Sequence, residues 1–155
     1  MPVIVVGADT EHGRAVAEAL SARDGEVRAF VTDPNAAQPL RARGIKVAVG
    51  DVSDASHIAG AALGAFSAVL IAEAGRDDRE RSFAASHDAL LRAWAEGLRD
   101  AGVSRVIWVA PGDNLPEAVA SSSMEGAVVD TRERDTGAVA AEAARLDDLA
   151  DLEPS

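Results

Sequence analysis

The chain contains no cysteine, no tyrosine and only one lysine, Lys46, among its 15 basic residues. The absence of cysteine excludes disulfides, thiolate metal ligands and a cysteine nucleophile. The absence of tyrosine excludes that side chain as a general acid or base. The sequence also lacks an 18-residue uncharged apolar run, and it lacks a basic segment followed by an apolar stretch and a cleavage site. We therefore expect a cytoplasmic protein without a membrane partner.

Basic residues are few relative to acidic ones, which number 26 and give a net charge of -11. Proteins that bind the phosphate backbone need clustered lysine and arginine, so nucleic acid is not an expected partner. Residues 111–155 hold 11 of the acidic residues and only three of the basic ones, which is typical of a solvated acidic surface. With 155 residues and 48% hydrophobic content, we expect a single domain over 1–150 and a frayed terminus over 151–155.

Short apolar runs rich in β-branched residues alternate along the chain with segments of helical periodicity. We expect strands at 2–6, 26–31, 45–49, 67–72, 103–110 and 127–130, and we assign no structure to 114–126. Helices are expected at 13–23, from Asp33-Pro34 to residue 44, and at 54–63, 77–101 and 136–149. This alternation predicts an α/β fold: a doubly wound, Rossmann-like, mostly parallel sheet of five or six strands in three layers.

The helix expected over 77–101 carries an apolar stripe at helical spacing. Its members are Phe83, His87, Leu90, Leu91, Trp94 and Leu98. Such a stripe is more often internal core than an interface, but it also suits a homodimer or another protein partner. We expect a homodimer.

The sequence shows no metal site and no catalytic constellation. The three histidines, His12, His57 and His87, have no ligand spacing between them, so we expect no bound metal. Ser86, His87 and Asp88 are consecutive, and consecutive helical side chains point in different directions, so they do not form a catalytic triad.

The segment VVGADTEHGRAV, residues 5–16, has the order strand, glycine turn, helix. Gly7 permits a tight turn after the strand, and Gly13 permits close packing of helix against strand. The free amide groups at the start of the helix favour a pyrophosphate. This arrangement suits a dinucleotide.

Five segments resemble, in this order and spacing, the NmrA-like, atypical short-chain dehydrogenase/reductase group of NAD(P)-binding proteins: VIVVGADTEHGRAVAEAL, EVRAFVTDP, GIKVAVGDVSD, AVLIAEAG and GVSRVIWVAP. The resemblance covers about residues 1–112. It implies that Gly7 and Gly13 flank the pyrophosphate, that Asp51 and Val52 lie near the adenine, and that Ala72 lines the cleft beside the nicotinamide-side ribose. The implied cofactor is NAD or NADP.

The chain departs from the family pattern at several cofactor-binding positions. Thr10 replaces the middle glycine of the turn, Glu11 adds a carboxylate near the phosphates, and His12 replaces an apolar residue. Thr32 stands where NADP-preferring relatives carry an arginine, and Arg14 and Arg28 are candidates to replace that arginine. Asp33 either binds a ribose hydroxyl or caps the following helix.

The family's catalytic Tyr-x-x-x-Lys motif is absent, and Ala110-Pro111 replaces the small hydroxyl residues that end the fifth strand. The chain also ends before the elements that form a substrate pocket in longer relatives. Two hypotheses follow. The first is a protein that binds a dinucleotide or senses its redox state without standard reductase catalysis, or an atypical oxidoreductase acting with a partner. The second is a non-catalytic structural or interaction module with a degenerate cofactor site.

Overall fold

A computed structural model describes residues 2–76 and 86–152. Within these residues one sheet contains six parallel strands: β1 Val3–Val6, β2 Val27–Val31, β3 Lys46–Val49, β4 Ser67–Ile71, β5 Arg105–Ala110 and β6 Glu125–Asp130. Their spatial order is β3-β2-β1-β4-β5-β6. Strands β1 to β3 follow one another toward one edge of the sheet, and strands β4 to β6 follow one another toward the other edge. The strand order therefore changes direction between β1 and β4, which is where doubly wound sheets have their ligand crevice.

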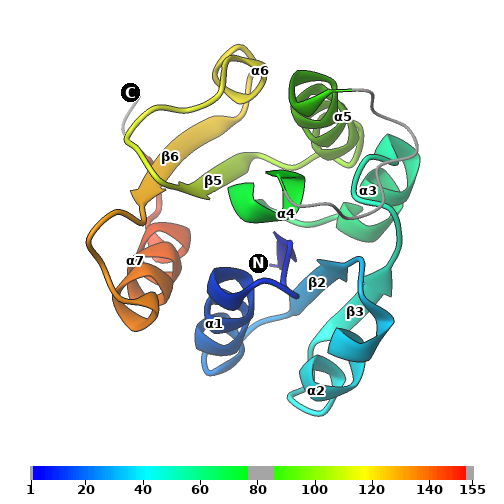
Figure 1. The fold of residues 1–155 in the computed structure, drawn as a ribbon, viewed down its shortest axis with the longest axis vertical. Helices are drawn as coiled ribbons and strands as arrows, with labels where there is room; N and C mark the ends of the chain where they lie inside the picture. The colour runs from blue at the N-terminus through cyan, green and yellow to red at the C-terminus, as the bar shows by residue number, and fades with distance from the viewer. Residues whose placement is uncertain (1, 77–85, 153–155) are drawn as a thin grey trace.

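Helices cover both faces of the sheet (Figure 1). The described helices are α1 Glu11–Ser21, the 3-10 turn η1 Pro34–Ala36, α2 Ala37–Arg41, α3 Ala55–Ala62, α4 Ala72–Arg76, α5 His87–Asp100, α6 Glu117–Ala120 and α7 Thr136–Asp148. Alternate residues of β1 point to opposite faces. Val3 and Val5 pack with α1, α2 and α7, whereas Ile4 and Val6 pack with α3 and α5. The predicted three-layer, doubly wound α/β fold is confirmed.

The prediction of one helix over 77–101 is wrong at its start. Ser86 has extended backbone angles, and its side chain accepts a hydrogen bond from the Ala89 amide, so a new helix begins at His87. Residues 77–85, including Phe83 of the expected stripe, lie outside the described residues. The sequence signal for the boundary was Ser86 itself, a favourable N-cap.

Other boundaries also differ from the sequence prediction. Strand β4 ends at Ile71, and the short helix α4 begins at Ala72. Helix α1 begins at Glu11, two residues earlier than expected, because Thr10 caps it. The unassigned segment 114–126 holds α6 and the first residues of β6.

The apolar stripe of α5 lies inside the molecule. Leu90, Trp94 and Leu98 are each 0% exposed and pack against the sheet. The Trp94 indole Nε1 donates a 2.6 Å hydrogen bond to the Val52 carbonyl in the loop after β3. These stripe residues are therefore core and do not form a surface on which a second copy could pack. The homodimer itself stays a prediction.

The end of α7 is fixed by a buried arginine from the sheet. Arg105 is 0% exposed, and its guanidinium donates hydrogen bonds to the carbonyls of Leu146, Asp147, Leu149 and Ala150. The same side chain pairs with Glu125 at 3.0 Å. The last carbonyls of a helix have no partner inside the helix, so this cation satisfies them and complements the helix dipole.

Candidate functional site

The turn between β1 and α1 has no room for side chains at its two glycines. Gly7 has a φ of +95°, and a methyl group added there would lie 2.6 Å from the Ala74 Cβ atom. A methyl group added to Gly13 would lie 1.9 Å from the Gly7 carbonyl oxygen. The start of α1 therefore lies directly against the end of β1, as the sequence predicts for a turn that cradles a phosphate.

Thr10, which replaces the middle glycine of the family motif, closes the turn from inside. Its hydroxyl donates to the Gly7 carbonyl at 2.7 Å and accepts from the Gly13 amide at 3.0 Å. The residue is 4% exposed, so its side chain occupies the interior of the turn rather than the space in front of it. The threonine acts as the helix N-cap in a position where the family motif has glycine.

The first amides of α1 remain available in front of the turn. In the described part of the chain, the amides of Glu11 and His12 have no hydrogen-bond partner within the protein. The Glu11 carboxylate accepts a 3.3 Å hydrogen bond from the Thr136 hydroxyl at the start of α7. The amides and the positive end of the α1 dipole thus retain the chemistry that binds a phosphate.

At the end of β2, the chain is tied to the turn by Asp9, a residue that the sequence analysis missed. The Asp9 Oδ2 atom accepts hydrogen bonds from the amides of Thr32 at 2.9 Å and Asp33 at 3.0 Å. The Asp33 carboxylate accepts from the Asn35 amide at 2.9 Å, which confirms its interpretation as a cap. The signal for Asp9 was an acidic residue two positions after Gly7, where its side chain can reach the neighbouring strand.

The two arginines considered as replacements for the one missing at Thr32 have other partners. Arg28 binds the Glu26 carboxylate at 2.8 Å and the carbonyls of Ala61 and Leu63. Arg14 is largely exposed and pairs with Glu18 at 3.6 Å. The Thr32 hydroxyl oxygen is buried and has no hydrogen-bond partner among the described residues.

The loop after β3 holds Asp51 and Val52, which the resemblance places near an adenine. The Asp51 carboxylate accepts hydrogen bonds from the amide and the hydroxyl of Ser53, at 2.8 and 2.6 Å. The Val52 residue is 1% exposed, and its carbonyl is held by Trp94. Asp51 thus shapes the loop, while Val52 contributes its side chain to the core.

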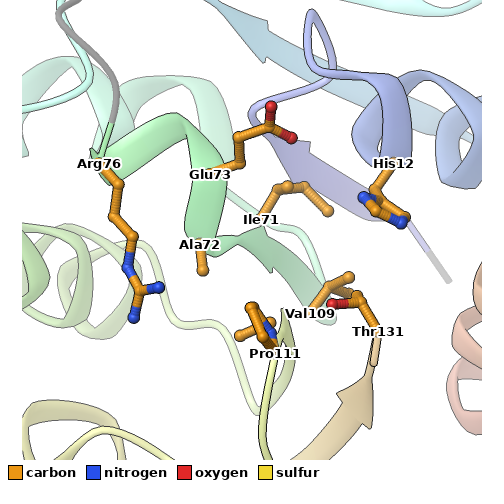
Figure 2. Close-up of a pocket in the computed structure, with 9 residues that line it drawn as sticks. His12, Ile71, Ala72, Glu73, Arg76, Val109, Pro111 and Thr131 are labelled. Atoms are coloured by element: carbon orange, nitrogen blue, oxygen red, sulfur yellow. The ribbon is translucent and has the colours of Figure 1, made fainter. Parts of the chain in front are cut away.

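A cavity of about 370 Å³ lies where the carboxyl ends of the central strands meet (Figure 2). Four elements and two residues that follow strands line it. They are His12 of α1, Ile71 of β4, Ala72, Glu73 and Arg76 of α4, Val109 and Ala110 of β5, and Pro111 and Thr131, which follow β5 and β6. The walls are mainly apolar, and the titratable side chains that line the cavity are those of His12, Glu73 and Arg76. Two residues predicted from sequence, His12 and Ala72, meet here. Glu73, Arg76 and Thr131 were missed, since nothing in the linear sequence signals them.

Asp130 fixes one wall of this cavity. Its carboxylate accepts from the Gly112 amide at 3.0 Å and pairs with Arg132 at 2.8 Å. The hydrogen bonds from the Arg132 side chain and amide hold the pKa of the Asp130 carboxyl well below its usual range. This carboxylate therefore stays charged and holds the Pro111-Gly112 turn beside Thr131.

No group of three or more histidine, cysteine or acidic side chains in 2–76 and 86–152 is arranged to hold a metal ion. None of the helices described for these residues has the length and apolar composition required to cross a bilayer.

Comparison with known proteins defines the class. The family model described as NAD(P)H-binding matches residues 7–148, and the chain therefore belongs to this family. The match confirms the resemblance to NAD(P)-binding Rossmann proteins. A search of curated proteins found no match.

Solved structures share the fold at low sequence identity. An anaerobillin reductase from Escherichia coli is 20% identical with a TM-score of 0.74, over 99% of this chain and 94% of that one. An NADPH-dependent quinone oxidoreductase from Escherichia coli, complexed with NADPH, is 19% identical with a TM-score of 0.77. That match covers 98% of this chain and only 66% of the quinone oxidoreductase. A short-chain dehydrogenase/reductase from Veillonella parvula is 14% identical with a TM-score of 0.67, over 97% of this chain and 88% of that one.

Proposed function

We propose that the chain binds a nicotinamide dinucleotide across the β1–β4 crevice and responds to its redox state without tyrosine-based reductase catalysis. The observation that carries this proposal is the cradle between Gly7 and Gly13, which a single methyl group would fill. The residues present fit the cofactor, because the cradle lies at the crevice of the sheet and leaves the amides of Glu11 and His12 without a partner among the described residues.

Each part of the dinucleotide has a matching part of the site. The pyrophosphate would lie over the start of α1, and the adenosine would extend toward the loops that hold Thr32, Asp33, Asp51 and Val52. The nicotinamide would then lie toward the cavity that His12 and Ala72 line. NmrA-like, atypical short-chain dehydrogenase/reductases are the subgroup that the turn and strand motifs favour.

Redox sensing rather than standard turnover is favoured by the residues around the cavity. Bound nicotinamide would supply hydride chemistry, but the sequence has no tyrosine to exchange a proton with a substrate. Strand β5 ends in Ala110 and is followed by Pro111, so neither position offers a hydroxyl. Among the titratable groups lining the cavity, His12 lies at the start of α1 and is only partly buried.

Calorimetric titration of the purified protein with NAD, NADH, NADP and NADPH tests the proposal. We expect micromolar binding of at least one of them. The Gly13→Val variant should abolish this binding, because its side chain collides with the Gly7 carbonyl. Gly60→Val in α3 is the matched control, since a methyl group at Gly60 has no atom within 4 Å.

A second variant tests the same site if Gly13→Val does not fold. His12→Asp places a carboxylate beside the bound phosphates, yet an acidic side chain is favourable in the first turn of a helix, so the fold should persist. We expect at least about tenfold weaker dinucleotide binding, from like-charge repulsion. Absence of binding to the wild-type protein would refute the proposal and favour a structural or interaction module with a degenerate site.

A further inference from the structure

We propose that Asp9 makes this site select the dinucleotide that lacks a 2′-phosphate, so that the chain binds NAD(H) in preference to NADP(H). The inference rests on the proposed function, and it assigns a specificity role to a residue outside the glycine motif. It also distinguishes this chain from the quinone oxidoreductase of similar fold, whose structure contains NADPH.

The geometry of Asp9 joins the first turn to the second strand. Asp9 lies between two buried residues of the turn, Ala8 and Thr10, and its Oδ2 atom accepts from two consecutive amides at the end of β2. Backbone amides in such a position are donors that an anion would otherwise use. Here a carboxylate of the protein already binds both.

The end of β2 is also where the 2′ position of a dinucleotide lies in this kind of sheet. In Rossmann domains, the side chain about 20 residues after the turn glycines contacts the 2′-hydroxyl of NAD, and a nearby arginine accommodates the 2′-phosphate of NADP. Asp33 stands at this spacing from Gly13, and its amide is one of the two that Asp9 binds. Asp9 and the ribose 2′ position therefore share one corner of the site, which is formed by Asp9, Thr32 and Asp33.

The charges of the corner oppose a phosphate. Asp9 and Asp33 are both acidic, and Thr32 stands between β2 and Asp33 without a positive charge. Arg28 is held by Glu26 and two carbonyls, while Arg14 pairs with Glu18. A 2′-phosphate would have to displace the Asp9 carboxylate from two hydrogen bonds while repelled by it, whereas a 2′-hydroxyl can donate a hydrogen bond to a carboxylate.

The test is calorimetric titration with NADH and NADPH of the wild-type protein, Asp9→Asn and Asp33→Asn, of which the last removes the second negative charge but none of the hydrogen bonds that Asp9 accepts. Asp24→Asn, at an exposed residue in the turn before β2, is the matched control for the loss of one charge. Asparagine keeps an oxygen to accept the amides of Thr32 and Asp33 but removes the charge, so the turn should persist; Asp9→Ser supplies a smaller acceptor if it does not. We expect the wild type to bind NADH at least about tenfold more tightly than NADPH. Asp9→Asn should bind NADPH about tenfold more tightly than the wild type, with NADH affinity within about threefold.

The possible failures are distinguishable. If the wild type binds neither dinucleotide while its melting curve shows a folded protein, the proposed function fails and the inference falls with it. If the wild type binds NADPH as tightly as NADH, or if Asp9→Asn leaves the ratio of the two affinities unchanged, the inference is overturned and the proposed function stands. A change of the ratio in Asp33→Asn alone would assign the selectivity to Asp33 and overturn the role of Asp9.

Discussion

Arg105 is a cation with no exposure to solvent, yet it begins β5, a strand that is paired on both sides. Its guanidinium lies 5.0 Å from the centre of the Phe66 ring and binds the last carbonyls of α7 and the Glu125 carboxylate. Buried cations are costly unless every donor has a partner, and here the partners come from two elements distant in sequence. The residue therefore couples the sheet to the final helix.

Arg105→Ala is expected to lower the free energy of unfolding by about 3 to 5 kcal/mol, because it leaves a cavity in place of a fully buried side chain and removes the partner of the buried Leu146 carbonyl. Urea unfolding followed by circular dichroism measures the change. Arg99→Ala, at an exposed position of α5, is the control and should stay within about 0.5 kcal/mol of the wild type. A loss at Arg105 no larger than at Arg99 would contradict the role assigned to this side chain.

At the level of single residues, the sequence predicted the glycines of the first turn but not the behaviour of their neighbours. Gly7 and Gly13 follow from backbone sterics, which the spacing of the motif reveals directly. The Thr10 hydroxyl bonds inside the turn and Asp9 reaches across to β2, so both depend on contacts formed only after the strands pair. Linear spacing carries no information about such contacts.

Among the elements, helix α5 connects the core to the loop after β3. The Trp94 ring is fully buried, and its Nε1 atom binds the carbonyl of Val52 in the loop after β3. Gly97 lies so close to α3 that a methyl group there would lie 2.7 Å from the Ala55 carbonyl oxygen. Helix α5 thereby holds α3 and the Asp51-Val52 loop in place.

Trp94→Phe is expected to lower the free energy of unfolding by about 2 to 4 kcal/mol, because it removes buried volume and leaves the Val52 carbonyl without its donor. The sedimentation coefficient should not change, since Trp94 faces the core. Leu63→Ala, at a side chain exposed after α3, is the control and should have a much smaller effect. Altered sedimentation at unchanged stability would contradict the internal role of Trp94.

The sequence predicts a strand or helix correctly where burial of the element determines its apolar pattern. It does not predict the residues at which an element begins and ends. Strands β1, β2, β4 and β5 are covered on both faces, and this burial produces the continuous apolar runs visible in the sequence. The start of α5 was misplaced because periodicity continues across Ser86, whereas the chain is extended there and the serine side chain caps the helix.

Because the strands of the sheet are parallel, the loops after β1, β2, β4, β5 and β6 all lie at its carboxyl end. Residues as distant in sequence as His12 and Thr131 line one cavity there. A second concavity, the α5–α6 groove, is lined by Leu91, Arg92, Ala95, Pro116 and Ala118, among others. It contains none of the turn or strand-end residues that carry the proposed function.

The measurement that tests the central claim most directly is an NMR titration of the isotope-labelled protein with NADH, followed through backbone amide shifts. Binding in the β1–β4 crevice should shift the amides of residues 7–13 most, together with those of 32–33, 72–73 and 131, because they belong to the turn, the end of β2 and the cavity lining. The amides of the α5–α6 groove should stay unchanged. No shifts at saturating NADH, or shifts confined to the α5–α6 groove, would contradict the account.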